Sequence, residues 1–183
     1  LSDVTYPRIS GTSVARDFVE LPSQLYEHWL REPAILSKYA VHYKTGAPMP
    51  SELIERLLAA ETFNQGFATV EYVSSALVDL ELHTMPASAT QDVGAIEKDI
   101  LARIEMPKEI VMRHRTPQFA HVFSGDGYSA GYYSYMWSEV MDADAFGAFK
   151  ETGDAFDGDM AEKLRTQIYS AGGSRDPADL YVA

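Results

Sequence analysis

The apolar residues of this chain recur at the three- and four-residue spacing of an α-helix, and few stretches alternate apolar and polar residues as half-buried strands do. Proline and glycine interrupt this pattern at intervals, and both residues favour turns and helix ends. The sequence therefore predicts an all-α fold, an irregular assembly of many helices. With 183 residues, the chain is long enough for one domain with a hydrophobic core.

Breakers and capping residues set the expected helix boundaries. Ser51 follows Pro50 as a helix cap, and Ser88 or Thr90 caps a later helix. Pro22 lies inside the first expected helix, where its missing backbone donor should produce a kink. We expect helices over about residues 14–31, 33–43, 51–62, 64–82, 88–105, 129–150, 158–170 and 176–182.

The expected helix over residues 64–82 has few helix breakers, so we expect it to be well buried. Its apolar residues are Phe67, Val70, Val73, Ala76, Leu77 and Leu80. Residues 106–127 form the least regular stretch of the sequence. Of the five histidines, we expect four to be structural, with the first two exposed: His28, His42, His83 and His114.

Charge and composition exclude several classes of function. The formal net charge of −12 argues against nucleic acid as a partner, because phosphate binding needs clustered lysine and arginine. Asp154, Asp157 and Asp159 lack the alternating ligands and the closing glutamate of an EF-hand, so we expect a solvated acidic surface there. The chain has no cysteine, which excludes disulfides and thiolate metal sites.

The sequence contains neither a basic-then-apolar leader nor a run of about 18 apolar residues. We therefore expect no membrane association, and a cytoplasmic location as the default.

Residues 124–135 place several phenols next to a glycine loop, shortly after His121. They read Ser-Gly-Asp-Gly-Tyr-Ser-Ala-Gly-Tyr-Tyr-Ser-Tyr. A helix beginning near residue 129 would put Tyr128, Tyr132 and Tyr135 on one face. Phenols on one face beside a histidine can donate several hydrogen bonds to one carbonyl or carboxylate. Tyrosines at this spacing are also typical of core packing with satisfied hydroxyls, and the spacing alone favours that reading.

Several sequence blocks resemble the thimet oligopeptidase and peptidyl-dipeptidase (dipeptidyl carboxypeptidase) family of zinc metallopeptidases. Residues 121–140, ending in Met-Trp-Ser-Glu-Val, are similar to the substrate-binding segment of that family. Residues 10–24, with Ser-Gly-Thr and then Asp-Phe-Val-Glu-Leu-Pro-Ser-Gln, form a second block. Residues 63–72 and the closing residues 172–177 are similar as well. The blocks follow the family order over nearly the whole chain.

The resemblance implies a zinc ion held by the two histidines of a His-Glu-x-x-His helix and by a glutamate on a following helix. None of the five histidines begins such a motif. The family places that motif shortly before the block at residue 10, so we expect Leu1 to follow it closely. Residues 1–183 would then be the C-terminal part of one larger, helical catalytic domain, with the missing N-terminal part of the same enzyme as its partner.

Glu20 matches the third zinc ligand of the family. A carboxylate there would complete three protein ligands and leave the fourth position to water, as catalytic zinc requires. Without the resemblance, Glu20 is typical of a solvated helical glutamate. One carboxylate cannot supply three ligands, so we expect the isolated chain to be inactive.

The resemblance assigns His121 and Tyr135 to the scissile carbonyl, where an imidazole or phenol stabilises the oxyanion. It assigns Tyr128 and Tyr132 to substrate contact. It also makes the loop around Gly125 and Gly127 a mobile segment that closes on a peptide.

The implied activity is release of C-terminal dipeptides from short peptides, and the loop length is similar to that of the dipeptidyl carboxypeptidase branch. Internal cleavage of short peptides by an oligopeptidase of the same family is the alternative. A non-catalytic peptide-binding module is a further alternative, if these residues are the natural product.

Overall fold

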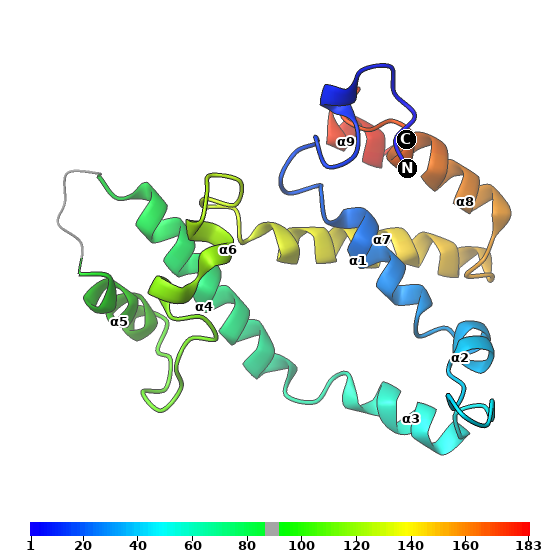
Figure 1. Ribbon diagram of the computed structural model, residues 1–183, viewed down its shortest axis with the longest axis horizontal. Coiled ribbons are helices and arrows are strands. Elements are labelled where there is room, and N and C mark those ends of the chain that lie inside the picture. The colour runs from blue at the N-terminus through cyan, green and yellow to red at the C-terminus, as the bar shows by residue number, and fades with distance from the viewer. Residues whose placement is uncertain (87–91) are drawn as a thin grey trace. The chain divides into compact units, whose positions relative to one another are not determined.

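The computed structural model describes residues 1–86 and 92–183 (Figure 1). Over these ranges the chain forms helices and turns, and its β-pairing is limited to one isolated antiparallel bridge between Val41 and Pro48. The prediction of an all-α fold is confirmed. In the described ranges, no helix combines the length and the apolar character needed to cross a membrane.

The chain divides into two compact units, each described here by itself. The first unit comprises residues 1–60 and 134–183, and the second unit comprises residues 61–133. That both belong to one catalytic domain stays a prediction.

The first unit is built around α1 and α7. Its elements are the 3-10 turn η1 (Pro7–Ile9), α1 (Leu21–Trp29), α2 (Pro33–Tyr39), α3 (Ser51–Ala60), α7 (Ser134–Thr152), α8 (Gly158–Leu164), the π-helical segment η3 (Arg165–Tyr169) and α9 (Pro177–Tyr181). Leu21 and Leu25 of α1 and Phe146 and Phe149 of α7 are buried. Trp29 meets both phenylalanine rings edge-on, with centroids 5.0 Å away in each case.

Pro22 lies in the first turn of α1 and does not kink the helix. The expected helix over residues 14–31 is shorter in the structure, because turns occupy the residues before Leu21. Proline lies in the first helical turn, where its missing N–H has no intrahelical partner to lose and its fixed φ suits the helix.

His28 of α1 is paired, which corrects the expectation that it is exposed. Its Nε2 lies 2.6 Å from Oδ1 of Asp142 on α7, and its ring stacks on Phe146 at 4.7 Å. Asp142 is only 3% exposed. A buried carboxylate needs a hydrogen-bond donor, and the imidazole supplies one from the facing helix.

The second unit contains α4 (Gln65–Thr84), α5 (Val93–Arg103), the 3-10 turn η2 (Thr116–Gln118) and α6 (Ala120–Phe123). Val78 of α4, Ile100 of α5 and Met112 form its buried apolar cluster. The expected caps Ser88 and Thr90 lie outside the described residues. The described cap of α5 is Asp92, whose side chain accepts a hydrogen bond from the Ala95 N–H at 3.1 Å.

The prediction that α4 is a well-buried apolar helix is wrong. Phe67, Val70 and Leu80 are 52%, 44% and 48% exposed, whereas Asp79 is 1% exposed. The buried face also carries the small polar side chains of Ser74 and Ser75. The buried face of α4 therefore contacts polar as well as apolar groups. For this reason the spacing of apolar residues in the sequence does not identify which face is buried.

A buried glutamate fixes part of the irregular stretch over residues 106–127. Oε2 of Glu97, on α5, accepts hydrogen bonds from the backbone N–H and the hydroxyl of Thr116 at 3.2 and 3.0 Å. Its Oε1 lies 2.7 Å from Nε of Arg115. Residues 115–116 are thereby held on α5, directly before the elements that carry His121.

Candidate active site

One histidine and two tyrosines from the predicted site gather in the second unit. The ring of His121, on α6, lies 4.5 Å from the ring of Tyr128 and 5.8 Å from that of Tyr132, measured between centroids. Phe119 meets Tyr132 edge-on at 4.8 Å. His121 is exposed, and both tyrosines are half-buried. The cluster therefore offers one imidazole and two phenols on a part of the chain that solvent reaches.

Tyr132 is fixed at its backbone and at its ring. Its N–H donates to Oδ2 of Asp79 at 2.9 Å, and its carbonyl oxygen accepts a hydrogen bond from the Tyr72 hydroxyl. The Tyr72 ring also stacks on it at 5.1 Å. Burial raises the pKa of the Tyr132 phenol, while Arg113 lowers it in part and Glu71 adds to the increase. A phenol of ordinary pKa, 10.0, already keeps its proton at neutral pH, and burial moves this pKa further from neutral, so the phenol can donate a hydrogen bond.

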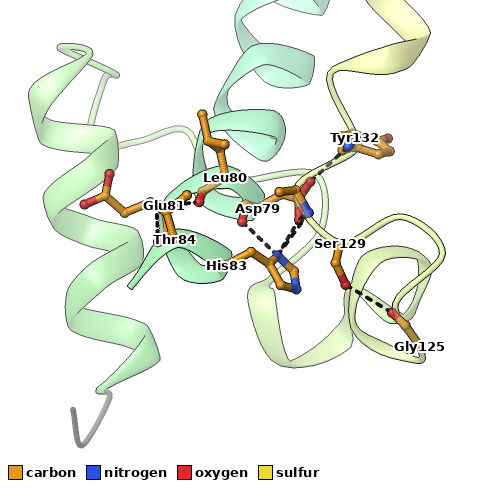
Figure 2. A network of polar contacts seen from close by, with 9 residues as sticks. Asp79, Leu80, Glu81, His83, Thr84, Gly125, Ser129 and Tyr132 are labelled. Atoms are coloured by element: carbon orange, nitrogen blue, oxygen red, sulfur yellow. Dashed lines mark hydrogen bonds and ion pairs between the residues drawn. The ribbon is translucent and has the colours of Figure 1, made fainter. Parts of the chain in front are cut away.

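The buried carboxylate of Asp79 is the centre of the network shown in Figure 2. Its Oδ1 accepts the Ala130 N–H at 3.0 Å and lies 2.7 Å from Nδ1 of His83. Ser129 Oγ donates to the carbonyl oxygen of Gly125 at 3.4 Å, a bond within the glycine loop. Asp79 is not among the site residues predicted from the sequence. The available signal was a carboxylate between Val78 and Leu80 in an apolar stretch, since such a group is rarely buried without a specific partner.

The segment before α7 is not helical, which corrects the expected helix start near residue 129. Helix α7 begins at Ser134, and Ala130 adopts a left-handed backbone conformation with φ of +55°. A residue other than glycine in that conformation interrupts a right-handed helix. The prediction that Tyr128, Tyr132 and Tyr135 share one helical face is therefore wrong, because the first two precede the helix.

The remaining predicted residues of the site differ in their positions. Glu20 directly precedes α1 in the first unit and is half-buried, and its Oε2 accepts a hydrogen bond from Ser23 Oγ at 3.1 Å. Tyr135 is in the first turn of α7, where its carbonyl oxygen accepts from Nε2 of Gln24 at 3.0 Å. Gly125 and Gly127 are exposed in the loop after α6. A Cβ at Gly125 would meet no atom within 4 Å, so packing does not require glycine there.

Among the described residues, no three His, Asp or Glu side chains lie together as a metal site would need. Glu20 fits one position of a zinc site, because its carboxylate offers oxygen ligands and Ser23 holds one of them. The rest of the described chain does not complete that ligand set.

Residues 1–183 match the sequence model of peptidase family M3. The chain is 40% identical over 179 residues to dipeptidyl carboxypeptidase of Escherichia coli (strain K12), covering 96% of this chain and 26% of the relative. It is 39% identical over 177 residues to oligopeptidase A of the same organism, covering 94% and 25%.

A plant protein is also similar to this chain. Probable cytosolic oligopeptidase A of Arabidopsis thaliana is 37% identical over 171 residues, covering 91% of this chain and 24% of the relative. The chain therefore spans about a quarter of the length of the curated relatives it matches.

The raised pKa of Tyr132 leads to a titration experiment. In an alkaline titration followed by tyrosinate absorbance, the signal missing from Tyr132→Phe should be centred above pH 10.0, the ordinary tyrosine pKa. The folded protein disfavours the phenolate. The free energy of unfolding should therefore fall only above the pH at which this tyrosine ionises in the unfolded chain. A missing signal centred at or below pH 10.0 would contradict the burial of this phenol.

Proposed function

This chain belongs to peptidase family M3, and we propose that it forms part of the catalytic domain of a zinc metallopeptidase that acts on short peptides. The observation that carries the proposal is the cluster of His121, Tyr128 and Tyr132, in a chain that matches the family over its full length. An imidazole and two phenols in reach of solvent can donate hydrogen bonds to the carbonyl groups or the C-terminal carboxylate of a peptide.

Release of C-terminal dipeptides is the proposed reaction, supported by the identity to a relative named dipeptidyl carboxypeptidase. Internal cleavage is the alternative, supported by the almost equal identity to a relative named oligopeptidase A. A cytoplasmic location belongs to the proposal too, supported by the relative named probable cytosolic oligopeptidase A. The rest of the same enzyme is the proposed partner of this chain.

Glu20 is the proposed zinc ligand of these residues, and the two histidine ligands come from outside them. Zinc, when bound, acts as a Lewis acid toward the peptide carbonyl and activates water. Glu20 is suited to this role by its position, because it is half-buried directly before α1 and the Ser23 hydroxyl orients its Oε2. The residues just after Glu20 are held in place, because Leu21 is buried and Nε2 of Gln24 donates to the carbonyl oxygen of Tyr135 at 3.0 Å.

The peptide is proposed to meet two sets of donors. Tyr128 and Tyr132 hold the substrate through their phenols, and burial raises the pKa of the Tyr132 phenol further above neutral pH. His121 and Tyr135 donate hydrogen bonds to the carbonyl oxygen as negative charge develops on it during attack by water. Gly125 and Gly127 give the loop the backbone freedom to close on the peptide.

The metal content of variants tests the role of Glu20. In the complete protein, Glu20→Gln should lose most of its zinc, because a neutral amide replaces an anionic ligand. Glu27→Gln is the matched control, since Glu27 is an exposed glutamate of α1, the helix that Glu20 directly precedes. Metal analysis after dialysis distinguishes the two variants. Full zinc occupancy in Glu20→Gln would remove this residue from the proposed site.

Peptide hydrolysis tests the role of Tyr135. In the complete protein, Tyr135→Phe should lower kcat by about 10²–10³ with little change in KM, because the lost hydroxyl acts only as charge develops. Tyr43→Phe, at a tyrosine that is 84% exposed, should leave both constants unchanged.

The products of the same assay separate the two proposed reactions. Release of dipeptides requires a free C-terminus, so amidating the peptide should abolish cleavage. Equal cleavage of amidated and free peptides would favour the oligopeptidase alternative.

For the Tyr135→Phe variant, a normal turnover would show that this phenol is not an oxyanion donor.

A further inference from the structure

We propose that Asp79 and His83 are positioning residues for peptide binding: from α4 they fix the backbone of residues 130–132 and so set the places of Tyr128 and Tyr132. This inference rests on the proposed function, because it assumes that these phenols contact a peptide. Neither Asp79 nor His83 is assigned a contact with substrate. Both act through the segment that carries the two tyrosines.

The carboxylate of Asp79 binds the backbone of residues 130–132 through two hydrogen bonds, and we call this pair of bonds the clamp. Oδ1 accepts the N–H of Ala130 at 3.0 Å, and Oδ2 accepts the N–H of Tyr132 at 2.9 Å. A carboxylate that is 1% exposed needs such donors, and hydrogen bonds to an ionised acceptor are stronger than neutral ones. Two N–H groups two residues apart must both face α4, which restricts the conformation of the segment between them.

His83 orients this carboxylate. Its Nδ1 lies 2.7 Å from Asp79 Oδ1 and 2.9 Å from the Asp79 carbonyl oxygen, and both atoms are acceptors. Nδ1 therefore carries a proton, and its approach to the Ala130 nitrogen at 3.3 Å is a contact between two donors rather than a hydrogen bond. Figure 2 shows the His83 imidazole next to Asp79, whose carboxylate also binds Tyr132.

The same imidazole also contacts the element that carries His121. The His83 ring stacks on Phe123 at 5.1 Å between centroids, and Phe123 ends the short helix α6. The pair on α4 thus contacts both parts of the candidate site in the second unit: α6, and the segment with Tyr128 and Tyr132.

Ala130 shows why the clamp is needed. Its φ of +55° lies in the left-handed region, which is unfavourable for a residue with a Cβ and persists only where the surroundings impose it. Its N–H is one of the two that Asp79 accepts. If the carboxylate were lost, the unfavourable backbone would be free to relax, and Tyr128 and Tyr132 on either side of Ala130 would move.

Asp79→Asn is the decisive substitution. It keeps the size of the side chain but leaves one acceptor oxygen, and it points an NH₂ group at the second N–H. In the complete protein, amide hydrogen exchange at residues 128–133 should become at least about tenfold faster. Glu81→Gln is the matched control on the same helix, because the Glu81 carboxylate pairs instead with Arg103 of α5 at 3.2 Å. It should leave that exchange unchanged.

Kinetics on the same variants distinguish positioning from a purely structural role. Asp79→Asn should raise KM for a short peptide by about tenfold while zinc content and the exchange of the buried residues Val78 and Ile100 stay as in the wild type. If Asp79→Asn does not fold, His83→Gln carries the test. It keeps the carboxylate and should speed exchange at the same amides by a smaller factor.

Each result decides the proposal. Faster exchange confined to residues 128–133, together with a raised KM, supports it. Unchanged exchange there overturns the clamp, and faster exchange throughout the second unit shows a fold anchor and overturns positioning. Faster local exchange with an unchanged KM also overturns it. If the wild-type protein does not hydrolyse peptides at all, the proposed function fails, while the exchange measurement still decides whether Asp79 holds the segment.

Discussion

The buried carboxylate of Asp79 is the constraint on which the candidate site depends. A charged group in the interior must be satisfied, and the donors available to it are His83 and the N–H groups of Ala130 and Tyr132. Ala130, whose N–H is one of these donors, has a left-handed φ of +55°, so the chain is not helical there and α7 begins at Ser134. The bonds to Asp79 place Tyr132 beside His121, and the Tyr72 hydroxyl donates a hydrogen bond to the carbonyl oxygen of Tyr132. One buried carboxylate thus binds the segment directly before α7 and the backbone of one residue of the cluster.

In the first unit, the predicted site residues Glu20 and Tyr135 lie at the starts of two helices that pack together, α1 and α7. Aromatic side chains of α1 and α7 interlock, with Trp29 edge-on to Phe146 and Phe149, and the buried pair of His28 and Asp142 joins the same two helices. These contacts lie at the C-terminal end of α1. At its start, next to Glu20, Leu21 is buried and Nε2 of Gln24 donates to the carbonyl oxygen of Tyr135. Ser23 Oγ binds Oε2 of Glu20, and the proposed zinc site takes its two histidine ligands from outside these residues.

The sequence predicted features that depend on local composition and missed those that depend on buried polar partners. Helical spacing and the distribution of breakers predicted the all-α fold, and the sequence blocks identified the family. The start of α7 was misplaced because Ala130 has no local signal for a left-handed conformation, which Asp79 imposes from a distant position. The burial of α4 was misjudged for a related reason, since its inner face includes Asp79 and two serines while Phe67 is exposed. Hydrogen bonds between residues far apart in the sequence cannot be predicted from the spacing of apolar residues.

The most direct test of this account is a crystal structure of the complete, zinc-loaded protein with a short peptide that it binds but does not cleave. The account predicts that Tyr128 and Tyr132 contact the peptide, that Glu20 is a ligand of the zinc ion, and that Asp79 keeps its bonds to the Ala130 and Tyr132 N–H groups. A peptide bound away from residues 121–135, or a zinc ion held without Glu20, would contradict it.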